Sequence, residues 1–261
     1  MKIGIGIITC NREHFFKKCI NSIRQTDLHS IVVVNDGREL EYVPTGVKVI
    51  QNKSSLSVGI CKNIAMQYLL DQGCDYIFTL EDDILIKDSE TFKHYINTSI
   101  DTGIEHFNFG FSQKENLDFN LNPVYKKIIE YKNSKIVLTQ NILGAFTFYT
   151  RNCLQHIGLH HKGFNKGHGD HPELTYRAFK HGFTTPFWWF ADVYGSWDMI
   201  VNQSNMGDDS LVRNQEKFWS NFKEACSLFG ELHGYDMLKV PVKSEQEVIQ
   251  ILRKIKNENN K

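Results

Sequence analysis

Three consecutive carboxylates, Glu81, Asp82 and Asp83, are the residues of this 261-residue chain that point most directly to chemistry. They follow residues 75–80, an apolar run with the length and composition of a buried strand. Adjacent like charges repel and raise each other's pKa unless a positive charge lies among them. A hard divalent cation, Mn²⁺ or Mg²⁺, would supply that charge because it prefers oxygen ligands. The alternative interpretation is a solvated acidic turn before the next helix.

A second candidate group lies within residues 167–177, where Asp170 and His171 precede Pro172. Proline fits the first position of a helix, so we expect His171 to be the cap of that helix. Asp170 then lies at the helix N-terminus, where the dipole favours the ionised carboxylate that a general base requires. Asp170 is our first candidate for the base and His171 the second, while a simple helix cap without chemistry is the alternative.

The elements that must position these residues alternate between strand and helix patterns. Buried-strand composition predicts strands at 2–9, 30–37, 47–50 and 75–80, and apolar residues at helical spacing predict helices at 12–24 and 59–73. This order favours an α/β fold with a mostly parallel central sheet flanked by helices. In open sheets of this kind, ligands bind at the carboxyl ends of the strands. The Gly-x-Gly pair near the start lies inside the first strand and is therefore not a dinucleotide fingerprint.

The second half of the chain combines strands, loops and amphipathic helices. It predicts strands at 106–111, 135–138 and 145–149, and helices at 89–100, near 172, at 211–229 and at 244–256. The last helix opens with a capping box, and its single apolar stripe favours docking onto the body of the protein over membrane contact. The glycine-rich segment 163–169 is a candidate lid. We expect a single domain over 1–235, with a nucleotide-sugar half at about 1–100 and an acceptor half at about 101–235, and a helical extension at 236–261.

Composition excludes several broad classes of protein. Thirty basic residues balance thirty acidic ones, so no global field attracts nucleic acid or an anionic membrane. The six cysteines are scattered without a C-x-x-C pair, which indicates reduced thiols in a reducing compartment. No apolar run reaches the roughly 18 residues of a membrane span, and the apolar start is too short for a signal peptide. These features predict a cytoplasmic protein.

The first eighty-odd residues resemble the family 2 type glycosyltransferases with the GT-A fold. The resemblance rests on four short pieces in the expected order, at 7–12, 33–37, 59–65 and 80–83. The carboxylate triplet resembles the D-x-D metal motif of that family. Its first Asp is replaced by Glu81, as in enzymes similar to N-acetylglucosaminyltransferase I.

The resemblance implies roles for individual residues. Those expected to contact the nucleotide sugar are Thr9, Asn11, Arg12, Asp36, Asn52, Lys62, Asn63, Glu81 and Asp82. Asp83 is implied as the direct ligand of Mn²⁺ or Mg²⁺, with Glu81 beside it. A later residue often closes over the metal and diphosphate in this family, and the candidates here are Asp198 and His233. Trp188, Trp189 and Trp197 are candidates for stacking on a sugar or a base, with a core role as the alternative.

Residues 170–177 also resemble a family signature, E-D-x-D-L-x-x-R, anchored by Leu174 and Arg177. At matched spacing, the Glu of that signature falls on Asp170. The Asp that directly follows this Glu, usually the base, falls on His171. This departure leaves the identity of the base open between the two residues.

The function implied is transfer of a sugar from a nucleoside-diphosphate sugar, with UDP favoured, to an acceptor hydroxyl with inversion. The acceptor remains open among a surface glycan, a lipid-linked glycan and a modified nucleobase of phage DNA. A non-catalytic nucleotide- or glycan-binding module is the main alternative. A metal-dependent hydrolase is a further alternative, and its metal ligands would be His160, His161, His168 and His171. The spacings of these four histidines match no common zinc pattern.

Overall fold

The computed structural model of the chain describes residues 1–23, 30–112, 114–204 and 216–258. Its strands are β1 (Ile3–Thr9), β2 (Ser30–Asn35), β3 (Lys48–Gln51), β4 (Tyr76–Glu81), β5 (Ile84–Ile86), β6 (His106–Asn108), β7 (Lys127–Glu130), β8 (Lys135–Thr139), β9 (Phe146–Thr150), β10 (Phe190–Val193) and β11 (Ile200–Asn202). Its α-helices are α1 (Glu13–Ile23), α2 (Val58–Asp71), α3 (Thr91–Thr102), α4 (Arg151–Ile157), α5 (Asp170–Lys180), α6 (Ser196–Met199), α7 (Phe218–His233) and α8 (Glu245–Glu258). Short 3₁₀ helices are η1 (Lys114–Asn116) and η3 (Met237–Lys239).

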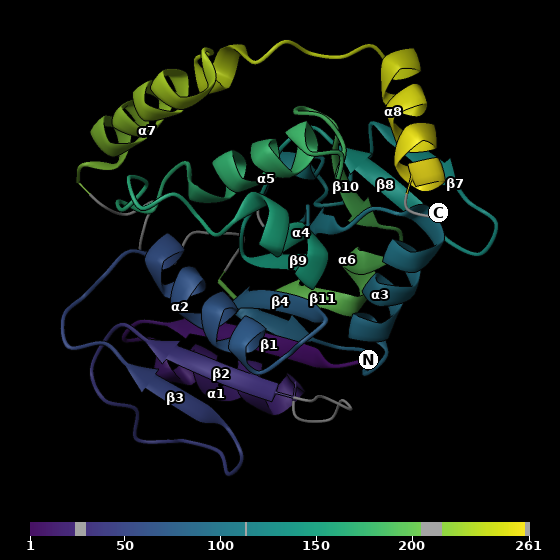
Figure 1. Cartoon of the computed structure of the whole chain (residues 1–261). Helices are drawn as coiled ribbons and strands as arrows, with labels where there is room; N and C mark the ends of the chain where they lie inside the picture. Colours follow the sequence, from purple (N-terminus) through teal and green to yellow (C-terminus); the bar gives the residue numbers. More distant parts are fainter. Residues whose placement is uncertain (24–29, 113, 205–215, 259–261) are drawn as a thin grey trace.

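A six-stranded sheet with the order β3-β2-β1-β4-β9-β6 forms the centre of the fold (Figure 1). Strands β1, β2, β3 and β4 are parallel, whereas β9 runs antiparallel to both β4 and β6. The predicted sheet, mostly parallel and flanked by helices, is therefore confirmed. Because β1 and β4 are neighbours, the turn after β1 and the carboxylates after β4 lie at the same edge of the sheet.

Helices cover both faces of the sheet and bury two apolar clusters. One face packs against α2, α4 and α5, and the other against α1, α3 and α8. Helix α1 buries the stripe that the sequence predicts, formed by Phe15, Phe16, Cys19, Ile20 and Ile23. The amphipathic spacing of this stripe places α1 directly beneath the strand ends where the carboxylates lie.

The two glycines of β1 allow α2 to approach the sheet closely. A Cβ atom added at Gly6 would lie 2.6 Å from the Cβ of Ala65, and one added at Gly4 would lie 2.7 Å from the Sγ of Cys74. These distances are too short for real side chains, so glycine is required by packing. The Gly-x-Gly pair therefore allows the middle and the C-terminal end of α2 to pack closely on β1.

Two small sheets complete the fold, one formed by β7, β8 and β10 and the other by β5 and β11. The second pairs Asn202 with Ile84 and so brings a late segment of the chain beside the carboxylates. The sequence analysis did not predict β5, β7, β10, β11, α4 or α6. These elements are short and rely on tertiary pairing more than on local periodicity.

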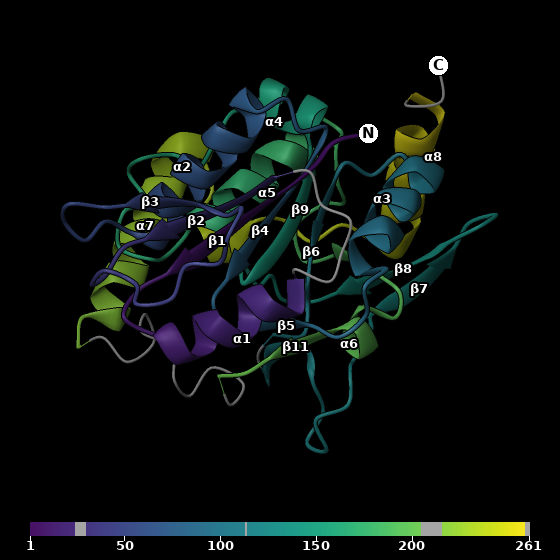
Figure 2. The same ribbon diagram turned by 90° about the horizontal axis from the view of Figure 1, so that it is seen from below.

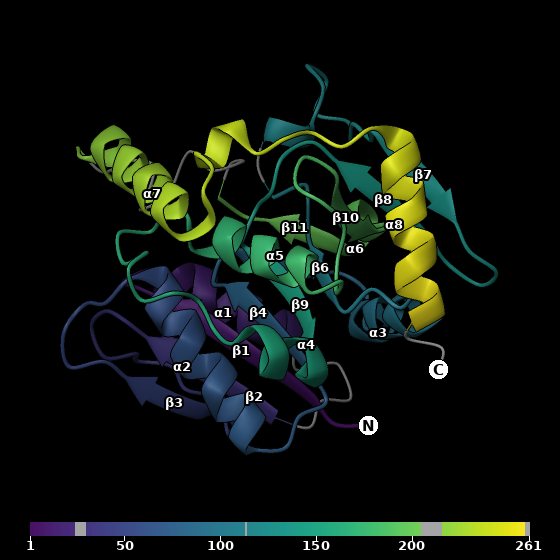
Figure 3. The same ribbon diagram turned by 45° about the horizontal axis from the view of Figure 1, so that its top comes forward.

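The C-terminal helix α8 lies beside α3 (Figures 2 and 3). Val248, Leu252 and Ile255 are buried in the main apolar cluster, so α8 is integrated into the core. The predicted capping box is present, because the Ser244 N–H donates to Glu247 Oε2 at 2.8 Å and the Glu247 N–H donates to Ser244 Oγ at 3.3 Å.

The helix predicted at 211–229 corresponds to α7, although positions 211–215 lie outside the described residues. Helix α7 continues past Phe229 as far as His233, four residues beyond the predicted end. Among the described helices, none combines the length and apolar composition needed to cross a bilayer.

We predict that Leu252→Ala lowers the free energy of unfolding by about 2–5 kcal/mol, because it removes a buried side chain that joins α8 to the core. Urea denaturation should show one transition shifted to lower urea. Arg253→Ala, on the exposed side of the same helix, is the control and should change the free energy by less than about 0.5 kcal/mol. A separate early transition that leaves the main one unmoved would show that α8 unfolds independently.

Candidate active site at the sheet edge

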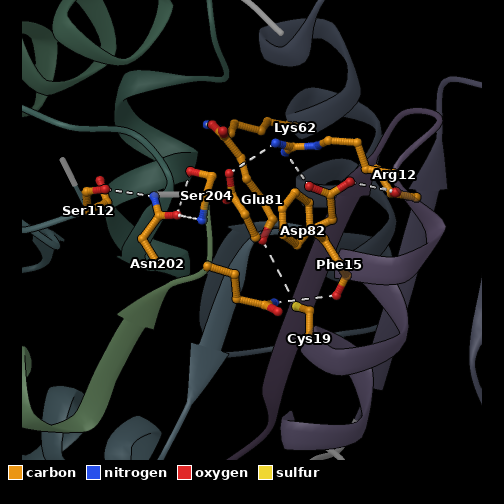
Figure 4. Close-up of polar contacts among 12 residues, drawn as sticks. Arg12, Phe15, Cys19, Lys62, Glu81, Asp82, Ser112, Asn202 and Ser204 are labelled. Carbon is orange, nitrogen blue, oxygen red and sulfur yellow. Dashed lines mark hydrogen bonds and ion pairs between the residues drawn. The ribbon is translucent and has the colours of Figure 1, made fainter. Parts of the chain in front are cut away.

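The positive charge that the carboxylate triplet requires comes from the chain itself. Arg12, in the turn after β1, donates from Nη1 to Asp83 Oδ2 at 3.2 Å and pairs through Nη2 with Asp82 Oδ1 (Figure 4). Thr9, the last residue of β1, donates from Oγ1 to Asp82 Oδ2 at 2.7 Å. Thr9 and Arg12, predicted to contact the nucleotide sugar, are thus brought to the triplet. The sequence analysis did not foresee this pairing.

The triplet retains a tendency to hold protons despite Arg12. Burial raises the pKa of Asp82 to about 7, and the nearby Asp83 adds to this effect against the opposing charge of Arg12. Burial and the charge of Glu81 likewise raise the pKa of Asp83. A further cation at this edge would therefore be electrostatically favoured.

Glu81 faces a second, buried cation. Lys62, on α2 and only 1% exposed, donates from Nζ to Glu81 Oε1 at 3.0 Å and to the Gly144 carbonyl oxygen at 2.7 Å. Burial alone would raise the pKa of Glu81, but the charge and hydrogen bond of Lys62 outweigh burial and lower it. Lys62 therefore joins α2, the end of β4 and the segment before β9.

Asp36, which follows β2, is held by three donors. Its Oδ1 accepts from Asn52 Nδ2 at 2.7 Å and from the Leu56 N–H at 2.8 Å, and its Oδ2 accepts from Ser55 Oγ at 3.1 Å. These bonds orient the carboxylate in the wall of the same cavity as Thr9 and the triplet.

Three predicted contact residues, Asn11, Asn52 and Asn63, form hydrogen bonds within the protein and do not line either of the two cavities at the site. Asn11 accepts from the Arg38 N–H, Asn52 supports Asp36, and Asn63 exchanges hydrogen bonds with the backbone of His160.

Two cavities meet at Glu81. One, of about 310 Å³, contains Thr9, Arg12, Asp36, Asp82 and Asp83 in its wall. The other, of about 400 Å³, contains Lys62 and Asp170 together with a largely aromatic wall. Both are lined by a shared set of residues, Val58, Glu81, Ala145 and Gly167.

Asp170 is the first residue of α5, and Gly169, with φ of +77°, caps the helix. The expectation that His171 caps the helix and Pro172 opens it is therefore wrong: glycine adopts the left-handed cap conformation without strain, and the helix starts two residues earlier. Asp170 is 1% exposed, and neither of its carboxylate oxygens has a hydrogen-bond partner among the described residues. His171 Nδ1 lies 3.7 Å from Asp170 Oδ1.

Two glycines make room for this pair. A Cβ at Gly59 would lie 2.9 Å from the Cβ of Asp170, and a Cβ at Gly144 would lie 2.8 Å from the Cγ of His171. The start of α2 and the segment before β9 therefore press directly against the start of α5. This close packing places Asp170 in the cavity wall that includes Glu81.

The charge state of Asp170 suits a base. Burial alone would raise the pKa of Asp170, but His171, His160 and Lys62 outweigh burial and hold it below its usual range. Burial lowers the pKa of His160 to about 4, so this imidazole is neutral at pH 7. His160 Nδ1 lies 3.0 Å from the backbone oxygen of Asp170, which fixes the ring behind the carboxylate.

The signature arginine has a structural role. Arg177 donates from Nε to Glu173 Oε1 at 2.7 Å and from Nη2 to the Leu159 carbonyl oxygen at 2.7 Å, which ties α5 to the loop after α4. His233 also binds Glu173, with 3.2 Å between Nε2 and Oε1. His233 and the exposed Asp198 line neither cavity, so the structure does not bring these two candidate metal ligands to the triplet.

The carboxylate oxygens of the triplet include one that is suited to bind a metal cation. Asp83 Oδ1 is buried and has no hydrogen-bond partner among the described residues. It is a hard oxygen of the kind that Mn²⁺ and Mg²⁺ prefer. Within the described residues, no group of three or more His, Cys, Asp or Glu side chains is placed to hold a metal ion. The four histidines of the hydrolase hypothesis accordingly form no such group among the described residues.

Asn202 and Ser204 reach the first cavity through β11, and the sequence analysis missed them. Asn202 donates from Nδ2 to the Ser112 carbonyl oxygen at 2.7 Å and accepts from Ser204 Oγ at 2.6 Å (Figure 4). The signal available in the sequence is a run of polar residues directly after a short apolar strand.

Of the three tryptophans predicted to stack on a sugar or a base, one lines a cavity and the other two belong to the apolar core. Trp188 lines the second cavity, whereas Trp189 and Trp197 pack in or against the main apolar cluster. Only Trp188 is therefore placed to meet a ligand in either cavity.

We predict that Lys62→Met lowers the free energy of unfolding by about 3 kcal/mol, because it leaves Glu81 without its buried partner. The double variant Lys62→Met with Glu81→Gln should recover part of this loss in urea denaturation. Lys93→Met, which removes a surface pair with Glu90, is the control and should cost less than about 1 kcal/mol. Additive single effects in the double variant would contradict the coupling.

We also predict that His160 contributes stability above its unfolded pKa of roughly 6.5 and loses it as the pH falls towards about 4. The unfolded state binds more protons over this range, so the free energy of unfolding falls with falling pH. His160→Gln should flatten the fall between pH 7 and 4.5. The exposed His156→Gln should leave the profile unchanged, and an equal slope in both variants would rule out this contribution.

No family model and no curated protein sequence matches the chain. Solved glycosyltransferase structures match its fold. The S. aureus TarS 1–349 structure matches with a TM-score of 0.55 and 15% sequence identity, and the match covers 98% of this chain and 70% of that one. A longer S. aureus TarS structure matches with a TM-score of 0.57 and 16% identity, and the match covers 98% of this chain and 43% of that one. The structure of GalNAc-T7 with UDP, GalNAc and Mn²⁺ matches with a TM-score of 0.57 and 12% identity, and the match covers 100% of this chain and 54% of that one. The chain thus has the mixed α/β architecture of GT-A glycosyltransferases, with a mostly parallel central sheet flanked by helices.

Proposed function

We propose that the chain is a metal-dependent glycosyltransferase that moves a sugar from a nucleoside-diphosphate sugar to an acceptor hydroxyl. The observation that carries this proposal is the junction of two cavities at Glu81. One cavity holds buried carboxylates suited to a metal and a nucleotide, and the other holds the buried, unengaged carboxylate of Asp170. A donor and an acceptor bound in adjacent cavities would meet at that junction.

UDP is the favoured nucleotide. Structures of similar fold were solved with UDP-GlcNAc, in TarS 1–349 with a TM-score of 0.53 and 16% identity, and with UDP, in GalNAc-T7. In this chain, Asp36 would hold the ribose or base, and the fixed orientation of its carboxylate supports this role. Arg12 supplies positive charge at the place where a diphosphate would lie.

The triplet would act as the D-x-D motif in its Glu-Asp-Asp form, with Asp83 as the metal ligand. A Mn²⁺ or Mg²⁺ ion bound there would neutralise the charge of the departing diphosphate. Glu81, held by Lys62 between the two cavities, would face the transferred sugar.

Asp170 is proposed as the general base, and His171 is the alternative. The acceptor oxygen forms a bond to the anomeric carbon while the bond from that carbon to the diphosphate oxygen breaks. The acceptor proton passes to Asp170, and the electron pair leaves with the diphosphate. An attack opposite the leaving group inverts the anomeric centre. The ionised state of Asp170 and its free oxygens support this role.

We predict that one nucleoside diphosphate, with UDP expected, raises the melting temperature in the presence of Mn²⁺. A ligand at 100 times its Kd adds about 2.7 kcal/mol to the free energy of unfolding, which a thermal-shift assay resolves. Asp83→Asn should remove the dependence on Mn²⁺, whereas Asp71→Asn, at the exposed end of α2, should not. Failure of every nucleotide to stabilise a folded protein would refute the donor half of the proposal.

We further predict that Asp170→Asn keeps nucleotide binding but lowers sugar transfer by roughly 10²–10⁴-fold, because it removes the base. Release of UDP and the mass of the glycosylated product measure the transfer. If Asp170→Asn transfers sugar at the unchanged rate and His171→Gln loses transfer, His171 is the base. Nucleotide binding without transfer to any acceptor would favour a binding module.

A further inference from the structure

The second cavity has a wall that the reaction chemistry does not require. Five aromatic side chains line it, from the segment before β10, from β10 itself and from α7: Phe187, Trp188, Phe190, Phe218 and Phe222. Asp170 lies in the same cavity. Such a wall presents flat apolar surfaces to any molecule whose hydroxyl reaches Asp170.

Trp188 is held in this wall at the expense of backbone strain. Its φ is +67°, a conformation that is an outlier for a bulky residue. Lys126 Nζ donates to the Trp188 carbonyl oxygen at 2.8 Å, and the Trp188 indole N–H donates to the Val240 carbonyl oxygen at 2.9 Å. Because the indole N–H is already bonded, Trp188 offers a ligand only its apolar ring surface. Strained residues that are fixed from several sides occur preferentially at ligand sites.

The charges of the cavity disfavour an anionic acceptor. Of the described lysines and arginines, only Lys62 lines the cavity, and it is already bound to Glu81 and the Gly144 carbonyl. Glu81, Glu115 and Asp170 contribute carboxylates to the same wall. With three carboxylates and one lysine in the wall, a phosphate or a nucleic-acid strand would meet a net negative set of acidic and basic side chains there.

Two cations of the basic segment 151–166, Arg151 and Lys166, are bound to other parts of the protein. Arg151 donates from Nε to the Cys74 carbonyl oxygen at 2.8 Å and from Nη2 to the Leu70 carbonyl oxygen at 2.7 Å. Lys166 pairs with Glu224. These bonds remove two of the cations that a polyanion would need.

We propose that the acceptor is an uncharged ring-bearing molecule, such as a neutral glycoside, whose apolar face stacks on Trp188 while its hydroxyl reaches Asp170. Trp188 is then a specificity-determining residue for the acceptor. The inference rests on the proposed function for the role of Asp170. The stacking itself is a binding property and can be tested without turnover.

The first test is binding in the absence of nucleotide. Ligand-observed NMR titration with an uncharged p-nitrophenyl glycoside should give a Kd that rises roughly 10-fold in Trp188→Leu and changes less than about threefold in Trp188→Phe. Trp188→Gly relieves the strained φ and is the second variant if leucine impairs folding. Trp219→Leu is the matched control, because Trp219 is 76% exposed and does not line the cavity.

The second test is transfer with the donor found by thermal shift. Trp188→Leu should raise KM for the neutral acceptor roughly 10-fold and leave KM for the donor unchanged. A sugar phosphate or a DNA oligonucleotide should be a poorer acceptor than the neutral glycoside.

Preferred use of a phosphorylated acceptor, or glycoside binding that does not depend on Trp188, would overturn the inference whatever the nucleotides do. Trp188-dependent glycoside binding supports it. If such binding occurs while no nucleotide stabilises the protein, the proposed function fails and the ring-binding site stands.

Discussion

The site depends on the neutralisation of three consecutive carboxylates at the end of β4 by two cations from other elements. Arg12 comes from the turn after β1 and pairs with Asp82 and Asp83, while Lys62 comes from α2 and pairs with Glu81. Each pair fixes one element of the N-terminal part of the chain to the same sheet edge. Burying such charges unpaired would cost several kcal/mol, so these pairs are conditions for the local fold. They also leave one carboxylate oxygen of Asp83 available to a metal.

Close packing at glycines joins the two halves of the chain around this edge. Gly59 and Gly144 leave just enough space for Asp170 and His171, which begin α5. Lys62 reinforces the contact, because its ammonium binds the carbonyl of Gly144 as well as Glu81. Asp170 is consequently buried next to the charged edge, and its oxygens accept no hydrogen bond from the described residues.

The two cavities differ in their physical character. The first is lined by carboxylates, Arg12 and polar groups, which suits a charged diphosphate and its metal. The second includes five aromatic side chains in its wall, among them Trp188, which is fixed in a strained conformation. In the proposed function, the first cavity would hold the charged donor and the second the uncharged acceptor, and the two would meet at Glu81. Helix α7 contributes Phe218 and Phe222 to this cavity wall, and η3 contributes Met237 and Leu238.

Local sequence patterns were sufficient to predict the long helices and strands. The apolar runs of β1, β2 and β4, the stripes of α1 and α2 and the capping box of α8 predicted those elements and the mostly parallel sheet. Such patterns arise from burial of one face, which nearby residues determine. Short elements such as β5 and β11 escaped prediction because they exist only through pairing with each other.

The sequence by itself determined which chemical groups are present: a carboxylate triplet, Asp36 after β2, and an aspartate beside a histidine near residue 170. Tertiary structure alone decided their partners. Arg12 meets Asp82 across 70 positions and Lys62 meets Gly144 across 82, distances over which no local pattern carries information. The start of α5 at Asp170, the placement of His233 on Glu173 and the strained conformation of Trp188 likewise follow from packing between segments remote in the sequence. Charge pairing and close packing depend on position in space, and only the folded chain supplies that position.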